Sequence, residues 1–191
     1  MKTGRWANWC ASWVLMAWMC SHAQVNAQQM VSASPDDVRK VFDAHKATCL
    51  FFFVEDCPVS MRDFGVVKSL SERFAGESMA WIAVYLGTNG DRLAAIADSI
   101  GLPIAYAQDP HHVLVDMASA RVTPEYFLFD SKGNLRYRGA IDNYAVGFAK
   151  HRPRATSTYL ADGIQALMEN RAVRTKSTQP FGCVIEPVDR E

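Results

Sequence analysis

An apolar run, Thr48 to Val54, constrains the fold more than any other feature of the sequence. Its length, its aromatic content and its lack of polar alternation favour a strand that is buried on both faces, in a central or parallel position of a sheet. A second run of this kind spans residues 79–87, after an intervening helical pattern. Two buried strands joined through a helix predict a sheet that is covered by helices.

Helical patterns alternate with these strands, with apolar residues three and four positions apart. They lie at residues 38–42, 61–74, 93–100 and 160–168. Residues 122–142 predict an antiparallel hairpin, because two short apolar segments flank a turn that contains Gly133. Residues 102–109 hold a possible short strand and residues 110–119 a short helical segment, whereas 143–156 and the tail, 173–191, follow no period. The order predicts an α/β fold with a central mixed sheet and helices on both faces.

Residues 1–27 have the layout of a secretory signal peptide. Lys2 and Arg5 precede a short apolar run that ends at Cys20, and small residues follow. The run is shorter than the roughly 20 residues that span a bilayer. We therefore expect a single mature domain, residues 28–191, that is periplasmic or secreted and has no stable membrane span. An uncleaved anchor and a lipoprotein cut before Cys20 are the alternatives.

Composition excludes several classes of protein. A hydrophobic fraction of 49% allows a buried core and excludes a disordered chain. The 20 basic residues balance 20 acidic ones, so no basic surface for nucleic acid is expected. Removal of the signal peptide leaves three cysteines, Cys49, Cys57 and Cys183. An exported compartment permits one disulfide among them.

Cys57 lies where the first buried strand gives way to a helix that begins near Pro58. The dipole at a helix N-terminus favours the thiolate, which is the nucleophilic form, so Cys57 is a candidate catalytic residue whose sulfur we expect to lie exposed. Glu55 and Asp56 act in the opposite direction, because nearby negative charge raises the pKa of a thiol. A buried structural cysteine is the alternative.

Three motifs resemble the thioredoxin fold. They are Cys57-Pro58-x-Ser60 at a strand-to-helix junction, Thr123-Pro124 before a strand, and the hairpin sequence FLFDSKGNLRYRGAID at residues 127–142. In detail the chain is similar to the redoxin branch of that superfamily, the group related to alkyl hydroperoxide reductase and thiol-specific antioxidant proteins, over residues 36–172. We expect thiol chemistry, with no cofactor and no metal.

The resemblance also implies a substrate groove. In the family, the proline at the position of Pro124 is cis and faces the active cysteine, and with Thr123 it forms the wall on which a partner peptide pairs its backbone. We therefore expect substrate binding at Pro58, Thr123 and Pro124. An ordinary trans proline at the start of a strand is the alternative.

The sequence departs from the family's patterns at two positions. Ser60 stands where a thioredoxin has its second cysteine, and Val54 stands where a peroxiredoxin has a threonine or serine. Neither a standard dithiol reductase nor a standard peroxidase is therefore predicted. Copper-delivery relatives of the fold use two cysteines and a distant histidine, and only one of those cysteines is in place here.

The second sulfur is expected in the tail, where Cys183 follows Gly182. A tail that returned across the edge of the sheet would bring Cys183 to Cys57. There it would either resolve a mixed disulfide by attack on sulfur, or form a permanent disulfide worth on the order of 4–5 kcal/mol. Cys49, at the start of the buried strand, is expected to be a core residue.

The favoured function is an exported thiol–disulfide oxidoreductase that acts through Cys57 on protein thiols or disulfides, with the reduction of small peroxides as a variant. One alternative is a non-catalytic binding module with a structural Cys57–Cys183 bond. Another is a copper-handling protein, since His111 and His112 could join Cys57, although a surface helix turn explains that pair as well. His151 is expected in a solvated loop, with recognition of an acidic partner as its alternative.

Overall fold

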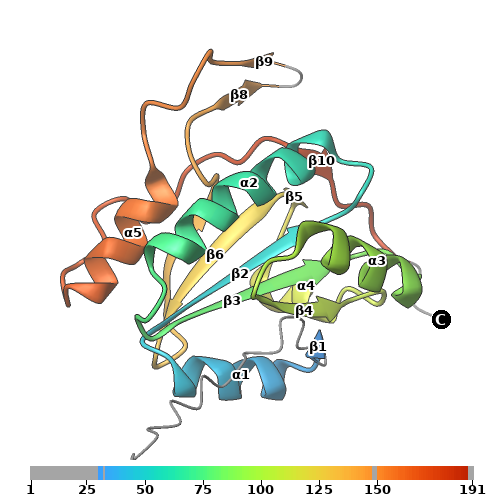
Figure 1. Cartoon of the computed structure of the whole chain (residues 1–191), viewed down its shortest axis with the longest axis horizontal. Coiled ribbons are helices and arrows are strands. Elements are labelled where there is room, and N and C mark those ends of the chain that lie inside the picture. The colour runs from blue at the N-terminus through green and yellow to red at the C-terminus, as the bar shows by residue number, and fades with distance from the viewer. Residues whose placement is uncertain (1–29, 32, 148–149, 189–191) are drawn as a thin grey trace, which may run out of the picture.

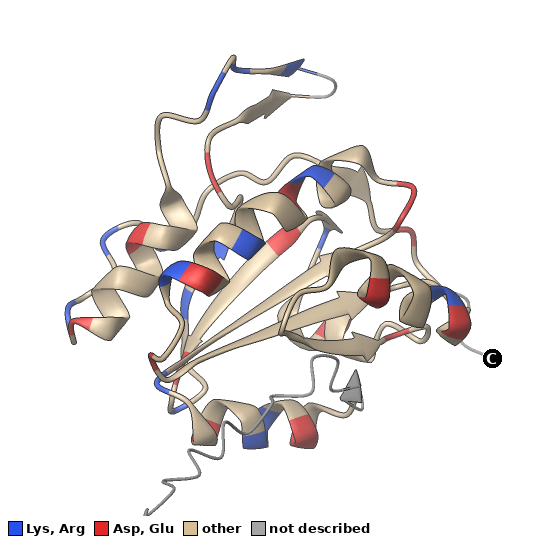
Figure 2. Ribbon diagram, viewed as in Figure 1, with Lys and Arg blue, Asp and Glu red and all other residues tan. Residues whose placement is uncertain are grey.

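The computed structural model describes residues 30–31, 33–147 and 150–188 (Figure 1). The expected signal peptide, residues 1–27, lies outside the described residues. Within the described part of the chain, no helix combines the length and the apolar character that crossing a membrane requires. Charged residues of both signs are scattered over the helices (Figure 2).

A six-stranded sheet forms the centre of the molecule. Its strands, in spatial order, are β1 (Met30–Val31), β4 (Ala105–Gln108), β3 (Met79–Tyr85), β2 (Ala47–Phe53), β6 (Glu125–Asp130) and β7 (Leu135–Gly139). The first four run parallel to one another, β6 runs antiparallel to β2, and β7 runs antiparallel to β6. Every residue of β2 is buried, so the predicted central strand and the predicted mixed sheet are confirmed.

Five helices of the described chain cover the two faces of this sheet. They are α1 (Pro35–Ala44), α2 (Pro58–Arg73), α3 (Gly90–Ile100), α4 (Val113–Ala118) and α5 (Tyr159–Met168). Helices α2, α3 and α5 share one cluster of buried side chains, and α1 and α4 share a second cluster. Strand β2 serves both clusters with alternate residues, Phe51 with the first and Phe52 with the second. The prediction of helices on both faces is confirmed.

The helix ends follow from local side chains. The Ser34 hydroxyl accepts a hydrogen bond from the Asp36 N–H (3.3 Å) and caps α1, and Asn89 caps α3 through the Arg92 N–H (3.0 Å). Gly101 ends α3 with a φ of 61°, in the left-handed region that glycine adopts without strain.

Residues 143–156, which were expected to be irregular, contain an antiparallel pair, β8 (Ala145–Gly147) and β9 (Lys150–His151). This β8–β9 arm projects away from the body of the molecule, beyond α2 and α5 (Figure 1). The Tyr144 and His151 rings stack with centroids 4.8 Å apart, and the Arg152 N–H donates to the Tyr144 carbonyl (2.8 Å). Ring stacking and backbone hydrogen bonds stabilise the arm. Neither kind of contact produces a periodic pattern of apolar residues, so the arm could not be predicted from the sequence.

The described tail, residues 173–188, is fixed at two places. It first runs beside β7, where the Arg138 N–H donates to the Lys176 carbonyl (3.0 Å) and the Thr178 N–H donates to the Arg138 carbonyl (3.1 Å). It then forms β10 (Cys183–Val184), which pairs antiparallel with β5 (Val122–Thr123). The tail therefore returns along the sheet and ends beside the residues that precede Pro124.

Candidate active site

Cys57 is the N-cap residue of α2, and Pro58 occupies the first turn of that helix. The carbonyl of Cys57 accepts a hydrogen bond from the Met61 N–H (3.1 Å), while its side chain makes no capping bond. The sulfur is therefore free to interact elsewhere, and Cys57 Sγ donates a hydrogen bond to the Thr123 carbonyl at 3.0 Å. The strand-to-helix junction thus places the thiol against the loop that carries Pro124.

The Thr123–Pro124 peptide bond is cis, as the resemblance implied. Thr123 pairs directly with Cys183 across the β5–β10 ladder. Gly182 makes this approach possible, because a Cβ atom at that position would lie 2.1 Å from the Thr123 carbonyl oxygen. The structure therefore brings the five predicted site residues together: Cys57, Pro58, Thr123, Pro124 and Cys183.

The expectation that the Cys57 sulfur lies exposed is wrong. The Cys57 side chain is 0% exposed, whereas Cys183 is partly exposed, and both cysteines are free thiols. The physical reason is the tail, since β10 lies on β5 and covers the thiol from the side at which a partner was expected. The wall formed by Thr123 and Pro124 is likewise occupied by the protein's own chain.

Two opposing influences set the pKa of Cys57. Burial alone would raise the pKa of this thiol, but the Cys183 thiol, the Ser60 N–H and hydroxyl, and the Cys183 N–H together hold it below its ordinary value. The Ser60 hydroxyl is buried and has no conventional hydrogen-bond partner among the described residues, which leaves it available to a thiolate. Ser60 therefore supports the charge on Cys57 from the position where a thioredoxin has its second cysteine.

Cys183 is shifted in the opposite direction. Burial, followed by its interaction with Cys57, raises the pKa of the Cys183 thiol to about 11. When this pair loses a proton, Cys57 is therefore the thiol that ionises first, and Cys183 keeps its proton. Thiolates are the nucleophiles in disulfide chemistry, and thiols of low pKa leave fastest. The two sulfurs are thus suited to different steps of an exchange reaction.

The acidic pair before Cys57 does not act as expected. Glu55 accepts a hydrogen bond from the Tyr85 hydroxyl (2.9 Å) and lies 3.5 Å from the Arg92 guanidinium. The pKa of Cys57 is lowered overall, so the predicted rise from neighbouring acids does not prevail.

A buried ion-pair cluster lies under the site and was missed from the sequence. The Arg62 guanidinium contacts Asp63 (2.7 Å) and Asp142 (3.1 Å), and the Tyr126 hydroxyl donates to Asp63 (3.1 Å). Burial raises the pKa of Asp63 to about 6, against the lowering effect of Arg62 and Tyr126. A signal existed, since Asp63 falls in helical register with the buried Val67.

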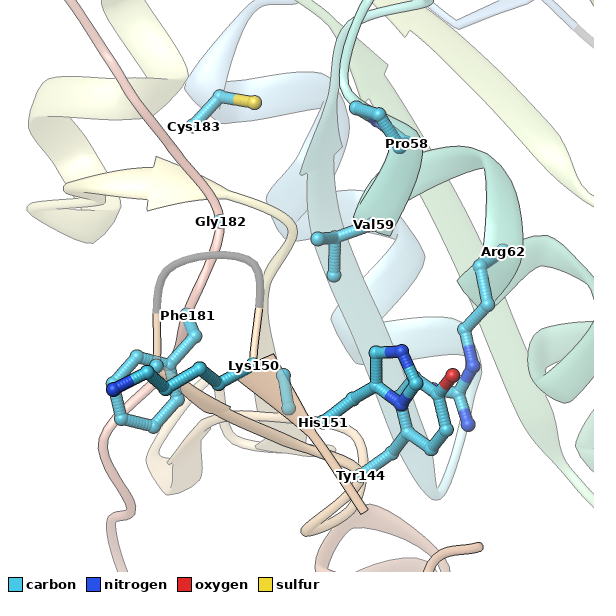
Figure 3. Close-up of a pocket in the computed structure, with 11 residues that line it drawn as sticks. Pro58, Val59, Arg62, Tyr144, Lys150, His151, Phe181, Gly182 and Cys183 are labelled. Atoms are coloured by element: carbon cyan, nitrogen blue, oxygen red, sulfur yellow. The ribbon is translucent and has the colours of Figure 1, made fainter. Parts of the chain in front are cut away.

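A cavity of about 410 Å³ opens beside Cys183. It lies between the start of α2, the β8–β9 arm and the tail, and Figure 3 shows the Cys183 sulfur directed across it toward Pro58. Val59, Tyr144 and Phe181 contribute apolar walls, and Arg62 lies over the Tyr144 ring with its guanidinium carbon 4.1 Å from the ring centroid. This cavity could not be predicted from the sequence, because three segments that are distant in the chain form it.

Of the other candidates, His151 lines the cavity beside Cys183, and His112 lines a separate pocket together with Thr123 and Val184. Cys49 is buried in β2, where burial raises its pKa, as a core cysteine should behave. His112 precedes α4 with a φ of 55°, and the Asp109 carboxylate caps that helix through the N–H groups of its first three residues. No group of three or more His, Cys, Asp or Glu residues in the described part of the chain could hold a metal ion.

Comparison with known proteins gives structural likeness only. No family model matches the sequence, and no curated protein is significantly similar to it. A hypothetical protein from Sinorhizobium meliloti 1021 superposes with a TM-score of 0.68 and 22% identity, over 77% of this chain and 82% of that one. A candidate thiol:disulfide interchange protein DsbE from Chlorobium tepidum gives a TM-score of 0.54 and 17% identity, over 66% of this chain and 82% of that one.

The decisive likeness is to a candidate thioredoxin from Neisseria meningitidis, with a TM-score of 0.53 and 15% identity over 68% of this chain and 79% of that one. This chain has a thioredoxin-like fold. Within that fold the position of Cys57, the cis bond before Pro124 and the β6–β7 hairpin agree with the resemblance seen in the sequence. The tail returns to the site, as the sequence analysis expected, but the burial of Cys57 beneath strand β10 was not expected.

Proposed function

We propose that this thioredoxin-like protein is a thiol–disulfide oxidoreductase whose redox couple is the pair Cys57 and Cys183. The observation that carries the proposal is that Thr123 contacts both cysteines, Cys57 through the hydrogen bond from its Sγ to the Thr123 carbonyl (3.0 Å) and Cys183 through the β5–β10 pairing. At this site the pKa of Cys57 is lowered and that of Cys183 is raised to about 11. A nucleophile and a resolving thiol need this division of roles.

The reaction begins at Cys57. Its thiolate attacks one sulfur of a substrate disulfide, the substrate S–S bond breaks, and the departing sulfur carries away the electron pair as a thiolate. A mixed disulfide then joins Cys57 to the substrate. Because Cys57 is fully buried, β10 must move off β5 before a substrate sulfur can reach it.

Cys183 completes the exchange. It loses its proton to the departing thiolate, attacks the Cys57 sulfur, and releases the second half of the substrate. The second half leaves as a thiolate and takes up from water the proton that Cys57 had lost, so the substrate disulfide has become two thiols. The protein dithiol has become a Cys57–Cys183 disulfide. A thiol donor must return two electrons to begin another cycle.

The test is turnover of a disulfide substrate, such as insulin, with dithiothreitol as donor. We expect Cys57→Ser to abolish turnover and Cys183→Ser to accumulate a mixed disulfide on Cys57. Cys49→Ala is the matched control, since Cys49 lies in the core away from the site, and it should turn over normally. Unchanged turnover in the Cys57→Ser variant would refute the proposal.

Reduction of small peroxides is a variant of the same chemistry. The Cys57 thiolate would attack one peroxide oxygen and become a sulfenic acid, while the O–O bond breaks and the other oxygen leaves and takes up a proton, as water or an alcohol. Cys183 would then condense with the sulfenic acid to form the disulfide and release a water molecule. Val54, in place of a peroxiredoxin's threonine or serine, gives this variant less support. Peroxide consumption that requires both cysteines would establish it.

The protein is proposed to act outside the cytoplasm, as a domain of residues 28–191, because residues 1–27 have the layout of a signal peptide. A structural disulfide in a binding module is the alternative to catalysis. The copper alternative has less support, since no metal-binding cluster occurs among the described residues. Cell fractionation with N-terminal sequencing of the mature protein tests export.

A further inference from the structure

We infer that the cavity beside Cys183 receives the electron donor, and that this donor is a small dithiol with an apolar body and a carboxylate. The inference rests on the proposed function. The substrate reacts with the Cys57 sulfur while the protein is oxidised, whereas the donor reacts with the Cys183 sulfur while the protein is reduced again. In the reducing half, the donor attacks Cys183, and Cys57 is the leaving group.

Access favours attack at Cys183. The tail strand occupies the β5 edge on which a peptide would pair, and Cys57 has no exposed surface beneath it. Cys183 is partly exposed and lines the cavity, whereas Cys57 does not. With the tail in place, a donor in the cavity therefore meets Cys183 first, and Figure 3 shows the Cys183 sulfur facing that space.

The size and walls of the cavity fit a small molecule. A volume of about 410 Å³ lies in the range of small-ligand sites, roughly 300–1,000 Å³. Val59 from α2, Tyr144 just before β8 and Phe181 in the tail enclose it with apolar surface. An aliphatic or aromatic body would replace water against these walls, which favours binding.

Charge selects an acidic ligand. Arg62, Lys150 and His151 line the cavity, and no Asp or Glu is among the described residues that line it. Arg62 is already paired with Asp63 and Asp142. Lys150 is exposed and forms no ion pair within the described part of the chain. Figure 2 shows basic residues along β9 and the segment that follows it, so a carboxylate at the cavity mouth would find Lys150 free.

The chemistry balances with a dithiol donor. One donor thiolate attacks the Cys183 sulfur of the oxidised protein, the Cys57–Cys183 bond breaks, and its electron pair leaves on Cys57. The second donor thiol loses its proton, attacks the first donor sulfur, and releases Cys183, which takes up that proton. The donor ends as a cyclic disulfide and the protein as a dithiol. Cys57 is suited to leave because its neighbours stabilise the thiolate.

The test uses the oxidised protein and two probes that differ only in charge, dihydrolipoate and its neutral amide, dihydrolipoamide. We expect the Cys57–Cys183 disulfide to be reduced about fivefold faster by dihydrolipoate, the effect of one partly screened ion pair. Lys150→Gln should bring the ratio of the two rates close to one. Lys132→Gln, in the distant β6–β7 turn, is the matched control and should keep the ratio.

The oxidised protein is treated once with 3-mercaptopropionate, a monothiol that stays bound as a mixed disulfide, and peptide mapping identifies the sulfur that it attacked. The adduct is expected on Cys183, and an adduct on Cys57 would overturn the inference. Equal rates for the two probes, or a ratio that survives Lys150→Gln, would also overturn it while leaving the proposed function intact. Failure of the wild-type protein to form the Cys57–Cys183 disulfide at all would instead refute the proposed function and the inference together.

Discussion

Cys57 and Cys183 share one site but hold their protons with opposite strengths. Burial works against a charge on either sulfur, and only Cys57 has enough surrounding donors to overcome it. One of these donors is Cys183 itself, and another is Ser60, whose hydroxyl has no other conventional partner in the described chain. The different roles of the two cysteines therefore depend on the hydrogen bonds that Cys57 receives.

Removal of the Cys183 donor should raise the pKa of Cys57. In Cys183→Ala the backbone N–H remains but the thiol is lost, so the thiolate loses stabilisation while burial persists. Titration of the thiolate by its ultraviolet absorbance measures this shift, with Cys57→Ser as the blank. A Cys57 pKa that does not change in the alanine variant would show that Cys183 plays no part in activation.

Asp63 should make stability depend on pH. Its pKa is raised from 3.8 to about 6, so the folded protein holds this proton more tightly than the unfolded chain does. The resulting stabilisation is complete below about pH 4 and is lost as the pH rises through about 6. Asp63→Asn removes this dependence, and the stability of the wild type relative to the variant should fall by up to about 3 kcal/mol from pH 4 to pH 7. Denaturant unfolding across this range measures the difference, and parallel profiles would contradict it.

At the scale of elements, the tail strand β10 determines access to the site. It adds to β5, and Gly182 packs against the Thr123–Pro124 bond, where a side chain would collide with the Thr123 carbonyl. Gly182 therefore permits β10 to pack over the site. The site opens only when β10 separates from β5.

Gly182→Ala should loosen the tail. Overpacking of this kind typically costs about 1–3 kcal/mol, so alkylation of Cys57 in the reduced protein should accelerate by about 5-fold to 150-fold. Gly65→Ala is the matched control, because a Cβ atom at Gly65 meets nothing within 4 Å. Equal Cys57 alkylation rates in the wild type and the Gly182→Ala variant would show that the tail does not protect the thiol.

The elements that the sequence predicts are those with a repeating pattern. Strand β2 is a continuous apolar run and α2 an amphipathic repeat, so both were predicted together with Cys57 at their junction. Strands β8, β9 and β10 are short and are held through backbone bonds and ring stacking. Such contacts produce no periodic pattern in the sequence, so the cavity and the burial of Cys57 could not be predicted. The proximity of Cys183 to Cys57 could be predicted.

At the scale of the whole molecule, a Cys57–Cys183 bond would join the tail to the start of α2. The chain-entropy model gives such a long loop a stabilisation of up to about 4–5 kcal/mol. The measured value should be smaller, because hydrogen bonds to the Cys57 thiolate stabilise the reduced protein. We expect the oxidised protein to unfold at higher denaturant concentration than the reduced protein, and Cys183→Ser to show no difference between the two conditions.

The reduction potential of this pair decides whether Cys57 and Cys183 form a working redox couple. The protein is equilibrated in glutathione buffers of known potential, quenched with acid, and the Cys57–Cys183 disulfide is quantified by peptide mapping. A two-electron transition at a potential above about −300 mV is predicted, because labile and catalytic disulfides lie in that range. A bond that forms only as a permanent link, with a potential well below about −300 mV, or the absence of any bond between these two sulfurs, would contradict the account.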